Sequence, residues 1–165
     1  MAQLPILTYP DPRLKEVCAP VEVFDASLHT FVAELEETMR ASPGGVGLAA
    51  PQVGMLRRIV IVDISVKRHM ENHGRLVLIN PEILAWDGMA RGREGCLSVP
   101  DYTANVIRAQ RITVTARDEY GTEHEYKFKD YEARAVQHEM DHLDGTLFLD
   151  RVVSRRNDLF RRENS

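Results

Sequence analysis

Two histidines four residues apart give this chain its clearest capacity for chemistry. Residues 137–142 read Gln-His-Glu-Met-Asp-His and lie in a helical pattern. Residues four apart on a helix share a face, so the imidazoles of His138 and His142 can reach one transition metal. Glu139, beside the first histidine, can reach a water molecule on that metal. The pattern predicts metal-assisted hydrolysis, although an amphipathic helix with two solvent-facing histidines has the same spacing.

A third ligand is needed, because a catalytic zinc usually takes three protein ligands. Some zinc proteases carry His-Glu-x-x-His-x-x-Gly-x-x-His, and this chain has Phe148 in place of the last histidine. Others take a glutamate from a second helix downstream, for which too little chain follows His142. The acidic residues that do follow have no supporting context: they are Asp144, Asp150, Asp158 and Glu163.

Cys96 is the upstream candidate for the third ligand. It follows Glu94 and Gly95, and a glycine there lets the backbone approach closely. A thiolate binds zinc or ferrous iron strongly. Most lone cysteines are small buried hydrophobes, so the residues alone leave both interpretations open. The other cysteine, Cys18, lies in a segment without histidines or an acidic cluster and is expected to be structural.

A glycine-rich stretch, residues 44–52, precedes both motifs. It matches the loose dinucleotide fingerprint, but a helical pattern precedes it and Pro51 disfavours a helix after it. A tight loop that lets a substrate backbone come close is the better interpretation, with Gln52 as an amide donor. A plain loop with an exposed glutamine fits the stretch equally well.

The periodicity of apolar residues predicts an α+β fold. We expect Asp25 to cap a helix that ends near Ala41, and Asp130 to cap a second helix from Tyr131 to about Leu143. Strands are predicted at 58–64, 76–86, 112–116 and 123–129, the last two forming a hairpin, with a surface loop at 69–74. The expected architecture has mixed or antiparallel strands packed around a central metal-binding helix, with an N-terminal helix.

Length and composition limit the class of protein. The 165 residues suit one domain, and a net charge of −4 argues against a DNA-binding protein. No apolar run could span a membrane, and residues 1–5 lack the pattern of a signal peptide. Two cysteines suggest a cytoplasmic protein with reduced thiols. Residues 151–165 form a basic tail that is either solvated or in contact with an anionic partner such as RNA.

Three stretches taken together resemble the motifs of the peptide deformylase family. Gly45 to Gln52 matches Gly-φ-Gly-φ-Ala-Ala-x-Gln (φ, apolar), Glu94 to Ser98 matches Glu-Gly-Cys-φ-Ser, and Gln137 to His142 matches Gln-His-Glu-x-x-His. Their order and spacing are similar to the bacterial and organellar form of the family. The resemblance implies a single peptide-deformylase-like catalytic domain over residues 1–150, followed by the short basic tail 151–165.

The resemblance implies a metallohydrolase that removes the N-formyl group from formyl-methionine of newly synthesised polypeptides and releases formate. Cys96, His138 and His142 would bind the metal and leave its fourth position to the water that attacks the formyl carbon. Glu139 would act as general base and then as general acid.

Further roles follow from the same resemblance. The side chain of Gln52 and the backbone N–H of Leu97 would stabilise the tetrahedral oxyanion. The substrate would lie along residues Gly45, Val46 and Gly47, with Glu94 and Gly95 as further substrate contacts. Arg134 stands where many bacterial members carry an apolar residue near the methionine pocket, and where other members carry arginine.

The family resemblance favours Fe²⁺ in the cell, with Zn²⁺, Ni²⁺ or Co²⁺ able to replace it. The expected partners are N-formylmethionyl nascent peptides and, through the basic tail, the ribosome. Neither DNA nor a membrane is expected as a partner.

Two other functions fit parts of the sequence. One is a zinc peptidase that cuts internal peptide bonds, and the other is a non-catalytic metal-binding module that docks on RNA through the basic tail. The identity of the third metal ligand and the need for Glu139 distinguish them from a deformylase. We also predict that Glu94 pairs with Arg108 across strands and braces the segment that carries Cys96.

Overall fold

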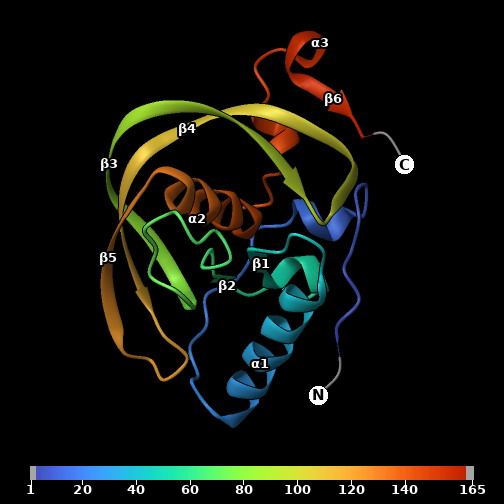
Figure 1. The fold of residues 1–165 in the computed structure, drawn as a ribbon. Coiled ribbons are helices and arrows are strands. Elements are labelled where there is room, and N and C mark those ends of the chain that lie inside the picture. Colours follow the sequence, from blue (N-terminus) through green and yellow to red (C-terminus); the bar gives the residue numbers. More distant parts are fainter. Residues whose placement is uncertain (1–2, 163–165) are drawn as a thin grey trace.

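A long, curved hairpin wraps around one helix in the computed structural model, which describes residues 3–162. The hairpin consists of β3 (Leu76–Cys96) and β4 (Val99–Arg117). Helix α2 (Asp130–Leu143) lies inside its curve, and β5 (Glu123–Lys129) extends the same wall (Figure 1). The predicted α+β architecture around a central helix is therefore confirmed.

The strands form one antiparallel sheet within the described residues. Its order is β1–β2–β3–β4–β5, and β6 (Leu159–Arg161) pairs separately with β4. β1 (Gly47–Ala49) is the terminal strand and pairs with β2 (Ile59–Val62). One backbone edge of β1, which is part of the glycine-rich stretch, therefore pairs with no other strand among the described residues.

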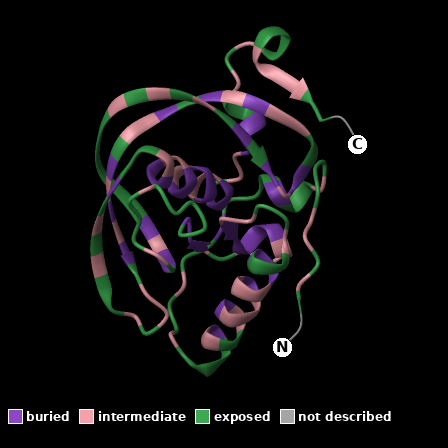
Figure 2. Cartoon of the chain, viewed as in Figure 1, coloured by how far each residue is buried: buried purple, intermediate pink, exposed green. Residues whose placement is uncertain are grey.

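Both faces of β2 are buried, which explains its unbroken apolar sequence. Val60 and Val62 pack toward α2, whereas Ile59 and Ile61 pack toward helix α1 (Ala26–Ala41). Successive residues of a strand point to opposite faces, so an apolar residue is needed at every position. Figure 2 shows the consequence: α2 is mostly buried or half-buried, while α1 buries only one face.

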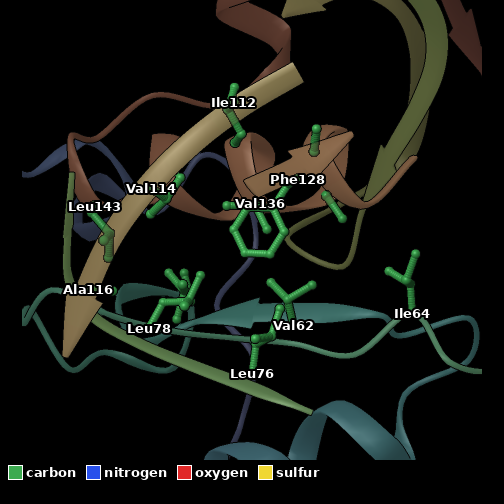
Figure 3. Packing of buried hydrophobic residues seen from close by; sticks show 14 residues of the cluster. Val62, Ile64, Leu76, Leu78, Ile112, Val114, Ala116, Phe128, Val136 and Leu143 are labelled. Atoms are coloured by element: carbon green, nitrogen blue, oxygen red, sulfur yellow. The ribbon is translucent and has the colours of Figure 1, made fainter. Parts of the chain in front are cut away.

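The core between α2 and the strands fixes the helix in place. Figure 3 shows side chains of β4, β5 and α2 meeting side chains of β2 and β3. They include Ile112, Val114, Phe128, Val136, Leu143, Val62, Leu76 and Leu78. Burying each large apolar side chain contributes about 1.5–3 kcal/mol, so the orientation of α2 is strongly determined.

The curvature of β3 begins at Asn80 and Pro81. β3 pairs with β2 only through Ile79, and the pairing with β4 shifts by one residue between Ile79 and Glu82. Pro81 has no backbone N–H to donate to a neighbouring strand. Asn80 adopts a left-handed conformation, with φ of 52°. The Asn80 side chain accepts a hydrogen bond from the N–H of Val21 and donates one to the carbonyl of Val21, each at 2.9 Å. The bulge turns the rest of β3 away from β2 and over α2.

The helices and the second hairpin largely agree with the sequence predictions. Asp25 caps α1 by accepting a hydrogen bond from Leu28 N at 3.1 Å, and β5 spans the predicted residues 123–129. The prediction that Asp130 caps α2 is wrong. Lys129 occupies the cap position, and the Asp130 carboxylate accepts a hydrogen bond from Gln110 Nε2 instead.

Several regions contain more strand than their sequences predict, among them residues 99–111, which extend the predicted strand 112–116 to form β4. Residues 87–96 are rich in glycine and charge, yet they continue β3, because pairing with β4 supplies the order that local propensity does not. Residues 44–52 are not only a loop: they contain β1 and a 3₁₀ turn, Ala50–Val53. The predicted surface loop at 69–74 is confirmed.

The segment after α2 folds back along the hairpin. A 3₁₀ turn (Phe148–Arg151) and a short helix α3 (Arg155–Asp158) lead into β6, which pairs with residues 102–104 of β4 (Figure 1). The last residues of the predicted basic tail, 163–165, and the first two residues of the chain lie outside the described part. Among the described residues, no helix is both long and apolar enough to cross a membrane.

We predict that Gly145, just after α2, is required for stability. It has φ of 71°, and a Cβ there would run into the backbone carbonyl of Lys15. Gly145→Ala should lower the free energy of unfolding in urea by about 3 kcal/mol, combining left-handed strain with a backbone clash. Gly74→Ala is the matched control, because Gly74 has the same φ of 71° but open space around it. It should cost about 1 kcal/mol. Equal losses would show that the contact with Lys15 is unimportant.

Candidate metal centre and active site

Three metal-binding side chains converge at the inner face of the hairpin. The ligand atoms of Cys96, His138 and His142 all lie within 4.8 Å of one another, and all three residues are buried. Cys96 Sγ is 3.5 Å from His142 Nε2. Two donors bound to one tetrahedral zinc or iron at about 2.0–2.3 Å also lie about 3.5 Å apart, so this donor set fits such an ion.

The ligands come from two elements that are distant in sequence. His138 and His142 lie one turn apart on α2, and Cys96 is the last residue of β3. A two-residue turn connects β3 to β4, and Val99, the first residue of β4, pairs with Cys96. Phe148 is buried and stacks on the His138 ring, with a centroid distance of 6.0 Å. The residue that replaces the histidine of some zinc proteases therefore packs against a ligand.

Glu94 orients the first histidine. Its Oε1 lies 2.8 Å from His138 Nδ1, which leaves Nε2 of that ring to face a metal. Burial opposes ionisation of Glu94, but His138 and Arg108 outweigh it and hold the pKa of the carboxyl well below its usual range. Burial also disfavours a charged His138, yet Cys96 and Glu94 raise the pKa of that imidazole. A carboxylate–histidine pair of this kind fixes the tautomer and orientation of a metal ligand.

The predicted pair of Glu94 and Arg108 is confirmed. Arg108 donates to both carboxylate oxygens, at 2.6 and 2.9 Å, and its side chain is 2% exposed. Its third contact is Asp141 Oδ2 at 2.9 Å, on α2 between the two histidines. Arg134 adds a second guanidinium to Glu94, at 2.6 Å, and donates to the backbone carbonyls of Val106 and Ala90. The network therefore joins α2, β3 and β4.

Glu139 is buried without a hydrogen-bond partner for its Oε1 among the described residues. Burial raises the pKa of this carboxyl to about 7, partly offset by the charges of His138 and Arg108. Gly47 lies against it, because a Cβ at Gly47 would be 2.7 Å from Glu139 Oε2. An unpaired buried carboxylate is costly, which points to a group kept ready to accept a proton.

Gln52 is fully oriented before any substrate binds. Its Oε1 accepts from Ala49 N at 2.9 Å, and its Nε2 donates to Ser98 Oγ at 3.0 Å. The same nitrogen is 3.6 Å from Cys96 Sγ. The second N–H of this amide therefore points toward the metal centre, and the alternative of an exposed glutamine in a plain loop is excluded by its burial.

One pocket of about 470 Å³ is lined by two of the metal ligands, Cys96 and His138, together with Glu139, Glu94 and Gln52. Its walls come from the glycine-rich stretch, from the end of β3 and from α2. The lining residues predicted from the sequence are Gly45, Val46, Gly47, Gln52, Glu94, Gly95, Cys96, Leu97, His138 and Glu139. His142 lies beneath them, 1% exposed, and burial lowers the pKa of its imidazole.

The sequence candidates for a downstream acidic ligand lie elsewhere. Asp144 pairs with Arg58, Asp150 with Lys15, and Asp158 with Arg91. Glu163 lies outside the described residues. Within residues 3–162, the cluster of Cys96, His138 and His142 is the one group of three such side chains close enough to share an ion.

Sequence reasoning placed Arg134 near the methionine pocket but did not identify several other lining residues. Tyr131 and Ala135 come, like Arg134, from the first turns of α2, while Arg93 and Arg162 form part of the outer wall. Arg134 and His138 lie four residues apart on one helix, and this spacing could have identified the lining residues that come from α2. Arg162 had no such signal, because only the pairing of β6 with β4 brings it to the pocket.

We predict that Arg108 supports the metal centre through Glu94. Arg108→Met removes the charge but keeps the bulk of the side chain, and it leaves a buried carboxylate with fewer partners. The free energy of unfolding should fall by about 3–5 kcal/mol, and metal affinity measured by chelator competition should fall about 10- to 100-fold. Arg111→Met on the same strand is the control. That side chain is 51% exposed, and its loss should cost about 0.5 kcal/mol. Wild-type metal affinity in Arg108→Met would refute the bracing role.

Comparison with known proteins agrees with this geometry. A family model described as polypeptide deformylase matches residues 3–158. The peptide deformylase of Chlorobaculum parvum is 45% identical over 152 residues, which cover 92% of this chain and 81% of that protein. The crystal structure of the Thermotoga maritima enzyme superposes with a TM-score of 0.86 at 37% identity, covering 93% of this chain and 100% of that one.

A class I type b peptide deformylase from Acinetobacter baumannii, solved with Met-Ala-Ser bound, has a TM-score of 0.85 at 36% identity. The match covers 92% of this chain and 99% of that one. These similarities extend across the elements that carry Cys96, His138 and His142. This chain therefore belongs to the peptide deformylase family.

Proposed function

We propose that this enzyme removes the formyl group from formyl-methionine at the N-terminus of newly synthesised polypeptides and releases formate. The observation that carries the proposal is the convergence of three metal ligands, an unpaired carboxylate and a fixed amide on one pocket. This set can activate water next to a carbonyl and stabilise the oxyanion that forms.

The substrate backbone would lie between two strand edges. β1 is the terminal strand of the described sheet, and its Gly47 reaches the pocket together with Gly45 and Val46. Glu94 and Gly95, near the end of β3, lie across from them. Main-chain pairing with an extended peptide recognises many sequences, as an enzyme for nascent chains requires. The methionine side chain would occupy the apolar part of the pocket, lined by Val46, Leu97, Tyr131 and Ala135.

Glu139 would move the proton. When bound by Cys96, His138 and His142, a divalent ion would polarise the formyl oxygen and make a nearby water more acidic. The Glu139 carboxylate would take a proton from the attacking water and deliver it to the leaving amine nitrogen. Its burial excludes bulk water from this transfer. Gly47 leaves room for the carboxylate, since any side chain there would displace it.

Gln52 and Leu97 would stabilise the tetrahedral intermediate. The Gln52 amide is held by Ala49 and Ser98, so it needs no reorganisation when the oxyanion forms. Leu97 lies in the turn after Cys96 and lines the same pocket. We assign Glu94 a positioning role in addition to its predicted substrate contact, because its oxygens are bound by His138, Arg108 and Arg134.

We propose Fe²⁺ as the ion in the cell, with Zn²⁺, Ni²⁺ or Co²⁺ able to replace it. One thiolate with two imidazoles suits iron and zinc alike, and membership of the family supports iron. Oxidation of ferrous iron or of the Cys96 thiolate would inactivate such an enzyme. A thiolate ligand and substrates fresh from synthesis both support a cytoplasmic location.

Contact with the ribosome is a further part of the proposal. We divide the chain into a catalytic domain, residues 1–150, and a short basic tail, residues 151–165. Arg155 and Arg156 of the tail are exposed, which suits binding to an RNA surface.

The first test is formate release from formyl-Met-Ala under anaerobic conditions, with metal analysis of the same sample. Glu139→Gln should keep the metal but lose turnover by about 10²–10⁴-fold, because the amide cannot accept the proton. Cys96→Ala should lose the metal, whereas Cys18→Ala, which removes a buried thiol outside the cluster, should retain it. A Cys96→Ala protein that keeps its metal and cuts internal peptide bonds would identify a peptidase instead.

A second prediction concerns Gly47. Gly47→Ala places a methyl group 2.7 Å from Glu139 Oε2 and should displace the carboxylate. We expect at least a tenfold loss of kcat with normal metal content, because small misplacements of a reacting group are costly. Gly44→Ala adds a methyl group to the same stretch in open space, so it carries only the strain of its φ of 66° and should lose far less activity. Equal activity of the two variants would show that the closeness of residues 47 and 139 has no role in turnover.

A further inference from the structure

Two arginines on the outer wall of the pocket have no part in the proposed chemistry. Arg93 and Arg162 both line the pocket and are exposed. The acidic side chains among the lining residues are Glu94 and Glu139, and both are buried. The carboxylate of Glu94 is already bound by two arginines and His138. The accessible charge at this side of the pocket is therefore positive.

Arg162 is brought to the pocket by the last strand. Thr103 of β4 pairs with Phe160 of β6, and Arg162 N donates to Asp101 O at 2.7 Å just beyond the strand. Its guanidinium lies directly over Gly95, because a Cβ on Gly95 would collide with one of its terminal nitrogens. Gly95 precedes the metal ligand Cys96. The charge is therefore placed next to the path of a bound peptide.

Arg93 contacts β6 and β4. Its guanidinium stacks on the Phe160 ring at 3.7 Å and donates to Asn105 Oδ1 at 3.2 Å and Thr103 Oγ1 at 3.4 Å. Arg93 therefore anchors β6 to the hairpin. Within residues 3–162, no carboxylate lies within ion-pair distance of the Arg162 guanidinium, and Arg162 lines the pocket.

We propose that Arg162 binds a carboxylate side chain at the second or third residue of the formylated peptide, so that acidic residues are preferred there over basic ones. The inference rests on the proposed function. An extended peptide advances about 3.3 Å per residue, so its next residues pass the wall beside Gly95 when the formyl group is at the metal centre. A guanidinium recognises a carboxylate through two parallel hydrogen bonds.

Arg161 provides a matched control. It has the same charge, is the last residue of β6 directly before Arg162 and is exposed, but it does not line the pocket. Neighbouring strand residues point to opposite sides. Removing Arg161 changes the net charge of the segment as much as removing Arg162. A general attraction of the basic tail for acidic peptides would therefore respond equally to both variants.

The test compares kcat/KM for amide-capped peptides formyl-Met-Ala-X and formyl-Met-X-Ala, with X as Glu, Gln or Lys. In the wild-type enzyme, Glu should exceed Gln by about two- to fivefold at one of the two positions, the size expected for a partly exposed ion pair. Lys should fall below Gln. The preference should disappear in 1 M salt, where charges are screened within about 3 Å. Arg162→Gln should bring the Glu/Gln ratio to about one, and Arg161→Gln should leave that ratio unchanged.

Each other outcome has a definite meaning. Equal ratios for Glu, Gln and Lys in an active wild-type enzyme would overturn the inference and leave the proposed function standing. Equal loss of preference in both arginine variants would also overturn it. An effect confined to uncapped peptides would show that the guanidinium binds the chain terminus, which overturns the assignment to a side chain. Absence of formate from every peptide would remove the proposed function and this inference together.

Discussion

The buried carboxylate of Glu94 is the interaction on which the rest of the site depends. It lies where β3, β4 and α2 meet, and it binds His138 on the helix and Arg108 on the neighbouring strand. An isolated charge at such a depth would be unstable, so its partners must all be in place when the protein is folded. The geometry of the metal centre is therefore determined by the same contacts that hold the helix inside the curved hairpin.

The curvature of the hairpin makes this meeting possible. A flat sheet would leave Cys96 far from the face of α2 that carries the histidines. The bulge at Asn80 and Pro81 turns β3 over the helix, and the strand then ends at the metal centre. Because Cys96 is placed by a strand and His142 by a helix, both ligands lie on rigid elements, which limits their reorganisation when a metal binds.

Arg134 is a charged residue at a pocket position where many bacterial members of the family carry an apolar one, and its contacts show how the charge is accommodated. Its guanidinium crosses to β3, donates to Ala90 O and shares Glu94 with Arg108. A Cβ at Gly92 would lie 2.9 Å from that guanidinium, so glycine at this position makes room for it. The arginine therefore acts as part of the wall beside the metal centre, with its guanidinium paired with Glu94.

Much of the chemistry was predictable from the sequence, because it depends on local spacing. The helical repeat alone places His138 and His142 on one face with Glu139 beside them, and Asp25 caps α1 through a contact with its own next turn. The pairing of Glu94 with Arg108 was also predictable, since a rigid ligand segment needs a brace.

Tertiary structure decided what depends on long-range pairing. The glycine-rich end of β3 has little strand propensity of its own, and it is ordered by β4. The same pairing brings Cys96 to the histidines and thereby settles whether it is a ligand or a small buried hydrophobe. Arg162 reaches the pocket only because β6 returns to β4. Sequence spacing determined the groups available for chemistry, whereas hydrogen bonds between distant strands determined which of them share one pocket.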